Sequence, residues 1–113
     1  MFDVDVIYKI CTRDEWEKAV NSGVYKGSQD DLRDGFIHFS SFDQVLGTLD
    51  KHFVDQKDLI LLKVKLELLN PAQLKWETAR NEEKLPHLYG DLNPDVVINV
   101  VEIAHDRRSG ENL

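Results

Sequence analysis

The chain has 113 residues and a formal net charge of −7, with 42% hydrophobic and 31% charged residues. This length is typical of one domain, and the composition excludes collagen-like, low-complexity and disordered proteins. The acidic balance disfavours non-specific binding to nucleic acid or anionic lipid, where cationic side chains dominate affinity. No apolar run reaches the ~18 residues of a membrane helix, and we find no signal-peptide pattern. We therefore expect one cytoplasmic domain over residues 1–113, with a core at about 5–104 and a disordered tail at 105–113.

Cys11 is the single cysteine of the chain, so no intramolecular disulfide and no cysteine metal cluster can form. This fits a reducing compartment. Within a strand, a lone cysteine is more often a small buried hydrophobe than a catalytic nucleophile, although both readings stay open.

The first elements are a strand and a helix. Residues 5–11 are rich in β-branched and aromatic residues and predict a strand. Thr12 and Glu15 then form a capping-box pattern that predicts the start of an amphipathic helix, and Gly23 is a suitable end.

The next segment carries a second strand and a second helix. Residues 24–34 have turn chemistry and charge, which predicts a loop with room for one helical turn. Residues 35–40 predict a strand. Ser41 and Gln44 repeat the capping box, and apolar residues then follow at helical spacing as far as Phe53.

The C-terminal half contains two further strands. Residues 58–67 alternate between apolar and charged positions and predict a strand with one core face. Residues 72–93 have no clear period, and Pro86 and Gly90 favour turns. Residues 96–104 predict the last strand. The order indicates an α+β fold: a mixed or strongly curved sheet with two amphipathic helices packed on it.

His38 and Ser40 alternate with apolar neighbours in the second predicted strand, so both point to one face. In one interpretation Ser40 or Ser41 caps the following helix and His38 is a half-buried histidine. In the other, two polar groups beside a helix N-terminus form an anion or ribose pocket.

Two later segments concentrate polar and aromatic residues. Trp76 packs in the core or on a lid, and Glu77 is either solvated or an acid–base group beside an apolar wall. Residues 86–90 predict a tight turn that presents His87 and Tyr89 to a ligand, unless Tyr89 only covers a sheet edge.

A metal site is not expected. The separations of His38, Glu77 and His87 neither support nor exclude one, but no HxH or HxxxH pair occurs in the chain. The remaining histidines, His52 and His105, are expected to face solvent. Nucleotide-binding glycine motifs, HExxH, CxxC and GxSxG are absent as well.

Several blocks together resemble the bacterial family known as domain of unknown function 952. They are IYKI, Trp16 with Ala19, Tyr25, DGFIHFS with Gln44, LILLKV, LKWE and PHLYGDL. The resemblance runs from about Val6 to about Val101, and the combination of GFIHFS with PHLYG is its most specific part.

That family is grouped with the ADP-ribosyltransferase-like superfamily. The resemblance therefore implies a split, curved, mixed or antiparallel sheet, with NAD bound in the cleft between its halves. Such proteins draw a polar residue from the first core strand, which here falls at Tyr8 or Lys9. The second strand would supply His38 or Ser40, and a late glutamate would be Glu77.

The resemblance thus implies an NAD or ADP-ribose-like ligand, with Glu77 and His38 as catalytic residues. The expected substrate-binding residues are Lys9, Tyr8, Ser40, Trp76, His87 and Tyr89. Many relatives carry a histidine at position 9, and a lysine cannot replace a histidine that accepts a ribose hydroxyl. A non-catalytic metabolite-binding module and a protein-interaction domain are the alternatives. A monomer is expected, because charged edge strands oppose association.

Overall fold

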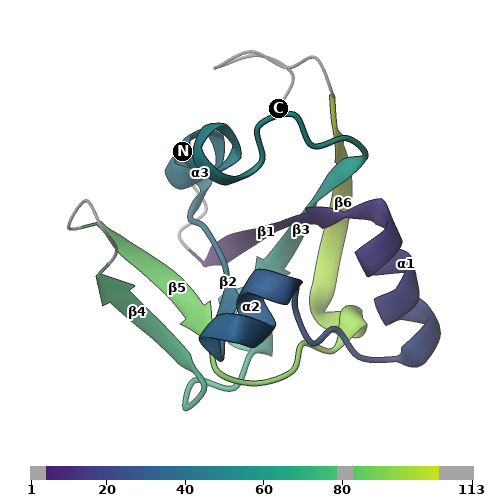
Figure 1. The fold of residues 1–113 in the computed structure, drawn as a ribbon. Helices are drawn as coiled ribbons and strands as arrows, with labels where there is room; N and C mark the ends of the chain where they lie inside the picture. The colour runs from purple at the N-terminus through teal and green to yellow at the C-terminus, as the bar shows by residue number, and fades with distance from the viewer. Residues whose placement is uncertain (1–4, 79–82, 105–113) are drawn as a thin grey trace.

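The computed structural model describes residues 5–78 and 83–104, which form two antiparallel sheets of three strands each (Figure 1). The strand order of the first sheet is β1 (Val6–Thr12), β3 (Leu59–Lys65) and β6 (Val97–Ile103). The order of the second sheet is β2 (Ile37–His38), β5 (Lys84–Leu88) and β4 (Leu74–Thr78).

A single bridge joins the two sheets. Tyr8 of β1 and Ser40, which follows β2, exchange both backbone hydrogen bonds at N···O distances of 2.8 Å. Every strand pair of the described residues is antiparallel. The α+β prediction is therefore confirmed, in its antiparallel rather than its mixed form.

Three α-helices and three short 3-10 helices complete the described fold. They are α1 (Arg13–Ser22), α2 (Gln29–Asp34), η1 (Phe42–Gln44), α3 (Val45–His52), η2 (Leu66–Leu68) and η3 (Pro94–Val96). The capping box that begins α1 is confirmed, since Thr12 and Glu15 bind each other's backbone N–H, and Gly23 ends the helix in a left-handed conformation. The helix predicted to follow Ser41 is α3, and it begins later than predicted because the 3-10 turn η1 precedes it.

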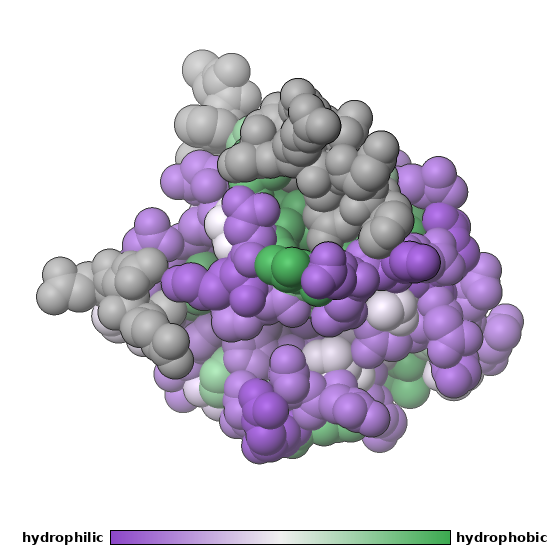
Figure 2. Space-filling model, turned by 45° about the horizontal axis from the view of Figure 1, so that its top comes forward, coloured by the Kyte–Doolittle hydropathy of each residue, from purple (hydrophilic) through white to green (hydrophobic). Residues whose placement is uncertain are grey.

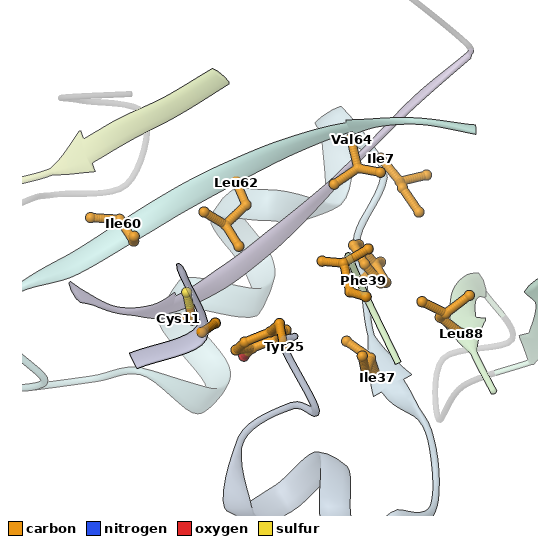
Figure 3. Close-up of a cluster of buried hydrophobic side chains, with 11 residues drawn as sticks. Ile7, Cys11, Tyr25, Ile37, Phe39, Ile60, Leu62, Val64 and Leu88 are labelled. Carbon is orange, nitrogen blue, oxygen red and sulfur yellow. The ribbon is translucent and has the colours of Figure 1, made fainter. Parts of the chain in front are cut away.

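The central strand β3 is buried on both faces, whereas its sequence predicted one core face and one wetter face. Ile60 and Leu62 point into the larger core between the two sheets (Figure 3). Leu59 and Leu61 point into a second core, which α3 covers. A strand with a neighbour on each side and a layer on each face has no solvent side, so both sets of side chains become apolar. Only Lys63 and Lys65 interrupt this burial near its end.

The region 72–93 was predicted to be irregular, and this is wrong: it holds β4 and β5. Pro86 lies within β5 rather than in a turn. Its carbonyl accepts from Phe39 N–H, so its nitrogen also faces β2, and no hydrogen bond to β4 is lost. The proline concealed the strand from sequence analysis.

The predicted strand over 35–40 is also shorter than expected, because only Ile37 and His38 pair with β5. The segment predicted as a loop with one helical turn contains α2. The predicted tail at 105–113 lies outside the described residues.

Figure 2 shows a face dominated by hydrophilic residues, with apolar atoms in small patches between them. Among the helices that the structure describes, none has the length and apolar character to cross a membrane.

Candidate functional site

The two sheets separate immediately after the bridge between Tyr8 and Ser40. In a continued antiparallel ladder the next hydrogen-bonded pair would be Ile10 and His38. Instead, His38 N–H donates to the Oδ1 of Asp31 at 3.2 Å. The backbone N–H and C=O of Ile10 point the same way as those of Tyr8, two residues earlier, and bond to no residue within 5–78 or 83–104. Among the described residues, the split therefore leaves one backbone donor and one backbone acceptor of Ile10 without a partner.

Asp31 is the residue that holds the split open. Its carboxylate is only 2% exposed and accepts from Lys9 Nζ at 2.8 Å and from Ser28 N–H at 2.9 Å. Gly27 makes room for it, since a Cβ at this glycine would lie 2.5 Å from the Asp31 Cβ. Lys9 of β1, Ser28 before α2 and His38 of β2 thus all bind one buried carboxylate.

The ring of His38 is bound on both sides by carboxylates. Nδ1 lies 2.6 Å from Asp31 Oδ1, and Nε2 lies 3.1 Å from Asp34 Oδ2. Only a doubly protonated imidazole can donate to both at once. Burial alone would raise the pKa of Asp31, but the hydrogen bond from His38 and the charge of Lys9 outweigh it and hold that pKa well below its usual range.

Two adjoining hollows open at the split. The smaller, of about 180 Å³, is bordered by Lys9, Ile10, Asp31 and Ser40. The larger, of about 770 Å³, lies between α3 and the β2–β5 pair and is bordered by Gln44, Lys51 and His87. His38, Thr48, His52 and Leu85 border both. The two hollows therefore adjoin at these four side chains.

Ser40 lies in the wall of the smaller hollow and caps no helix. Its hydroxyl shares a hydrogen bond of 3.0 Å with the hydroxyl of Thr48 on α3. The capping alternative applies instead to Ser41, whose backbone N–H donates to Gln44 Oε1 at 3.0 Å. Because Ser40 also forms the bridge to Tyr8, it ties both sheets and α3 together at the site.

A second carboxylate–histidine pair lies on the β4–β5 hairpin. The Oε1 of Glu77 is 2.8 Å from His87 Nδ1 and accepts from the Tyr89 hydroxyl at 2.6 Å. These hydrogen bonds, from Tyr89 first and from His87, lower the pKa of Glu77, and the bond to Glu77 raises the pKa of Tyr89. Phe36 stacks on the His87 ring with centroids 4.1 Å apart, so one face of this ring is covered.

Not every predicted site residue borders the hollows. Lys9, His38, Ser40 and His87 do, whereas Glu77 and Tyr89 reach them only through His87.

Tyr8 packs on the α3 side of β1, with its ring 5.8 Å from that of Phe42. Trp76 precedes Glu77 in β4 and therefore points to the opposite face of the sheet. Trp76 and Glu77 were both predicted as site residues because no strand, and therefore no alternation of faces, was predicted at residues 74–78.

The residues predicted for the site did not include Asp31, Thr48 or the backbone groups of Ile10. The signal for Asp31 was present: Ser28 and Asp31 form an S-x-x-D capping box at the start of α2. Nothing local marks Ile10, because its freedom depends on where two sheets separate. Within the described ranges, no group of three or more His, Cys, Asp or Glu side chains is placed to hold a metal ion.

The sequence pattern of a family described as protein of unknown function (DUF952) matches residues 10–100. The chain belongs to DUF952. No curated protein matches it.

Solved structures of a similar protein support the DUF952 fold. The X-ray crystal structure of protein CC0527 from Caulobacter crescentus is 41% identical, with a TM-score of 0.84, and the match covers 88% of this chain and 86% of that one. The solution NMR structure of CC0527 is 40% identical, with a TM-score of 0.78, and the match covers 91% and 90% of the two chains. CC0527 therefore has the same fold as this chain.

Proposed function

We propose that this protein binds a pyridine nucleotide of the NAD class, with the carboxamide group on Ile10 and the rest of the ligand along the two joined hollows. The observation that carries this proposal is the free N–H and C=O pair of Ile10 in the wall of the smaller hollow. A primary carboxamide presents one acceptor and two donors, so it satisfies both backbone groups as a strand neighbour would.

The size of the hollows supports a ligand of this kind. Drug-sized ligands occupy clefts of roughly 300–1,000 Å³, and the larger hollow of about 770 Å³ lies within this range. The smaller hollow, of about 180 Å³, accepts a single aromatic ring beside Phe39 and Ile10. A ring in one hollow and a nucleotide in the other would meet at His38, which borders both.

The side chains of the larger hollow suit a phosphorylated sugar. Lys51 provides a cationic group for a diphosphate and His52 provides a ring nitrogen beside it, while Thr48 and Gln44 provide neutral polar groups for hydroxyls. Lys9 is not free for this purpose, because its ammonium is 2.8 Å from Asp31 and buried. Its part in the proposal is to fix Asp31 and, through Asp31, His38.

The test compares nicotinamide with nicotinic acid, and NAD with its nicotinic acid analogue, by titration of 15N-labelled protein. Nicotinic acid keeps the ring but loses the donor, since a carboxylate only accepts. We expect NAD and nicotinamide to shift the amide signals of Ile10 and His38, and the two acid analogues to bind at least about tenfold more weakly, a difference of about 1.4 kcal/mol.

A variant pair complements the ligand pair. His38→Ala should weaken NAD binding, whereas Lys18→Met, on the exposed face of α1, should leave it unchanged. Equal binding of the amide and acid ligands would remove Ile10 from the proposal. If neither NAD nor ADP-ribose shifts any signal of the two hollows, the proposed function is wrong.

A further inference from the structure

The ring of His87 is held in one tautomer with one nitrogen available to the larger hollow. Nδ1 is 2.8 Å from Glu77 Oε1, and the carboxylate accepts, so the proton lies on Nδ1. Nε2 then carries a lone pair and has no bonding partner in the part of the chain that the structure describes. His87 is 8% exposed and borders the larger hollow, so this lone pair is confined to it.

The other histidine of the site lacks such an atom. Both nitrogens of His38 face carboxylate oxygens, those of Asp31 and Asp34, so His38 can donate but has no free lone pair. The two rings lie edge to face with centroids 5.4 Å apart. Of the two rings, that of His87 therefore offers the nitrogen that is available to a ligand.

We propose that His87 is the general base of an NAD-hydrolysing reaction at this site, a role that rests on the proposed function. Nε2 of His87 takes a proton from a water molecule, whose oxygen forms a bond to C1′ of the nicotinamide ribose. The bond between C1′ and the pyridine nitrogen breaks, and its electron pair stays on the departing nicotinamide. The products are nicotinamide, ADP-ribose and a proton, which His87 releases to solvent.

In this reaction Glu77 is a positioning residue. Its carboxylate borders neither hollow and is bound by His87 and Tyr89, so it acts on the substrate only through the His87 ring. This differs from the direct catalytic role that the family resemblance implies for Glu77. A carboxylate behind an imidazole fixes its tautomer and stabilises its protonated form.

Several charged and titratable groups surround His87. Charged and titratable groups face it, or share its hollow, from every neighbouring element: Glu77 and Lys75 of β4, His38 of β2, Tyr89 after β5, Glu83 before β5, and Lys51, His52 and Asp43 around α3. Glu77 is the one in hydrogen-bond contact, so removing its charge should have the largest effect.

The experiment measures two quantities on the full-length protein: ADP-ribose affinity by calorimetry, and nicotinamide release from NAD by chromatography. His87→Asn keeps a donor for Glu77 but has no basic nitrogen. We expect it to lower kcat by about 100-fold or more and to change the ADP-ribose Kd by less than about threefold. Thr78→Val, on the exposed face of the same hairpin, is the matched control and should preserve both values.

Comparing kcat with ligand affinity separates positioning from folding effects. Glu77→Gln removes the carboxylate that fixes the tautomer of the His87 ring, so kcat should fall while the ADP-ribose Kd changes by less than about threefold.

The outcomes distinguish the two proposals. ADP-ribose binding without nicotinamide release, or release that His87→Asn leaves intact, overturns the role of His87 while the proposed function stands. Failure to bind either nucleotide overturns both.

Discussion

A single oxygen of Asp31 binds His38 twice: Oδ1 accepts the backbone N–H at 3.2 Å and lies 2.6 Å from the ring Nδ1. The first contact takes the N–H that would otherwise continue the ladder to Ile10, and so begins the split between the sheets. The second orients the ring at the junction of the two hollows. One side chain from α2 therefore sets both the shape of the site and the position of its histidine.

Asp31→Asn should destabilise the protein strongly, because it leaves Lys9 charged and buried without a counter-ion. Breaking a buried ion pair from one side costs about 3–5 kcal/mol. We expect this decrease in the free energy of unfolding at pH 7, measured by urea denaturation. Asp30→Asn, on the exposed face of the same helix, is the control and should change it little.

The same carboxylate should make stability depend on acid. The pKa of Asp31 in the folded protein is well below that of an unfolded aspartate, about 3.9. Its contribution is therefore complete above the unfolded pKa and is lost as the pH falls from about 4 toward the folded pKa. The difference between wild type and Asp31→Asn should shrink in that window. A constant difference between pH 7 and pH 2.5 would contradict the assignment.

Gly27 and Gly35 provide a matched pair for testing close packing around Asp31. Both have positive φ, of 105° and 88°, so alanine at either should cost about 1 kcal/mol of backbone strain. Only at Gly27 would the new Cβ clash, at 2.5 Å from the Asp31 Cβ, whereas nothing lies within 4 Å at Gly35. Thermal unfolding should show the larger loss for Gly27→Ala, with shifted His38 resonances. Equal losses would mean that Asp31 can move at no cost.

Cys11 should be unreactive in the folded protein. It is 1% exposed, and burial raises the pKa of its thiol to about 12, so almost no thiolate exists at pH 8. Iodoacetamide should fail to label it over hours in buffer and should label it fully in urea, as read by mass spectrometry. Rapid labelling of the native protein would show that the core around β1 opens readily.

Tyr89→Phe should raise the pKa of Glu77 toward the ordinary value for a glutamate of about 4.3. The Tyr89 hydroxyl is the main cause of the lowered pKa, and the His87 bond supplies the rest. A 13C titration of the side-chain carboxyl would measure the change. Because both side chains are partly exposed, the free energy of unfolding should change little. An unchanged titration midpoint would show that the hydroxyl does not bind Glu77 in solution.

The site was partly foreseeable from the sequence. Alternation along the strand placed His38 and Ser40 on one side, and the GFIHFS and PHLYG blocks supplied residues that the structure brings together: His38 pairs with His87 in register. The predicted turn at residues 86–90 failed because a strand tolerates proline where the neighbouring strand ends. Pro86 faces Phe39, just beyond the end of β2, and its carbonyl still accepts from Phe39 N–H.

The amino-acid sequence by itself determined the local structure: the capping boxes at Thr12 and Ser28, the glycine end of α1, and the apolar run of β3 all act within a few residues. Only the tertiary structure decided where the two sheets part. That point depends on a buried carboxylate reaching the His38 backbone from seven residues away, and on Lys9 reaching it from another strand. Such contacts form only when folding brings these segments together and their mutual attraction offsets the cost of removing water from both partners, so no local pattern records them.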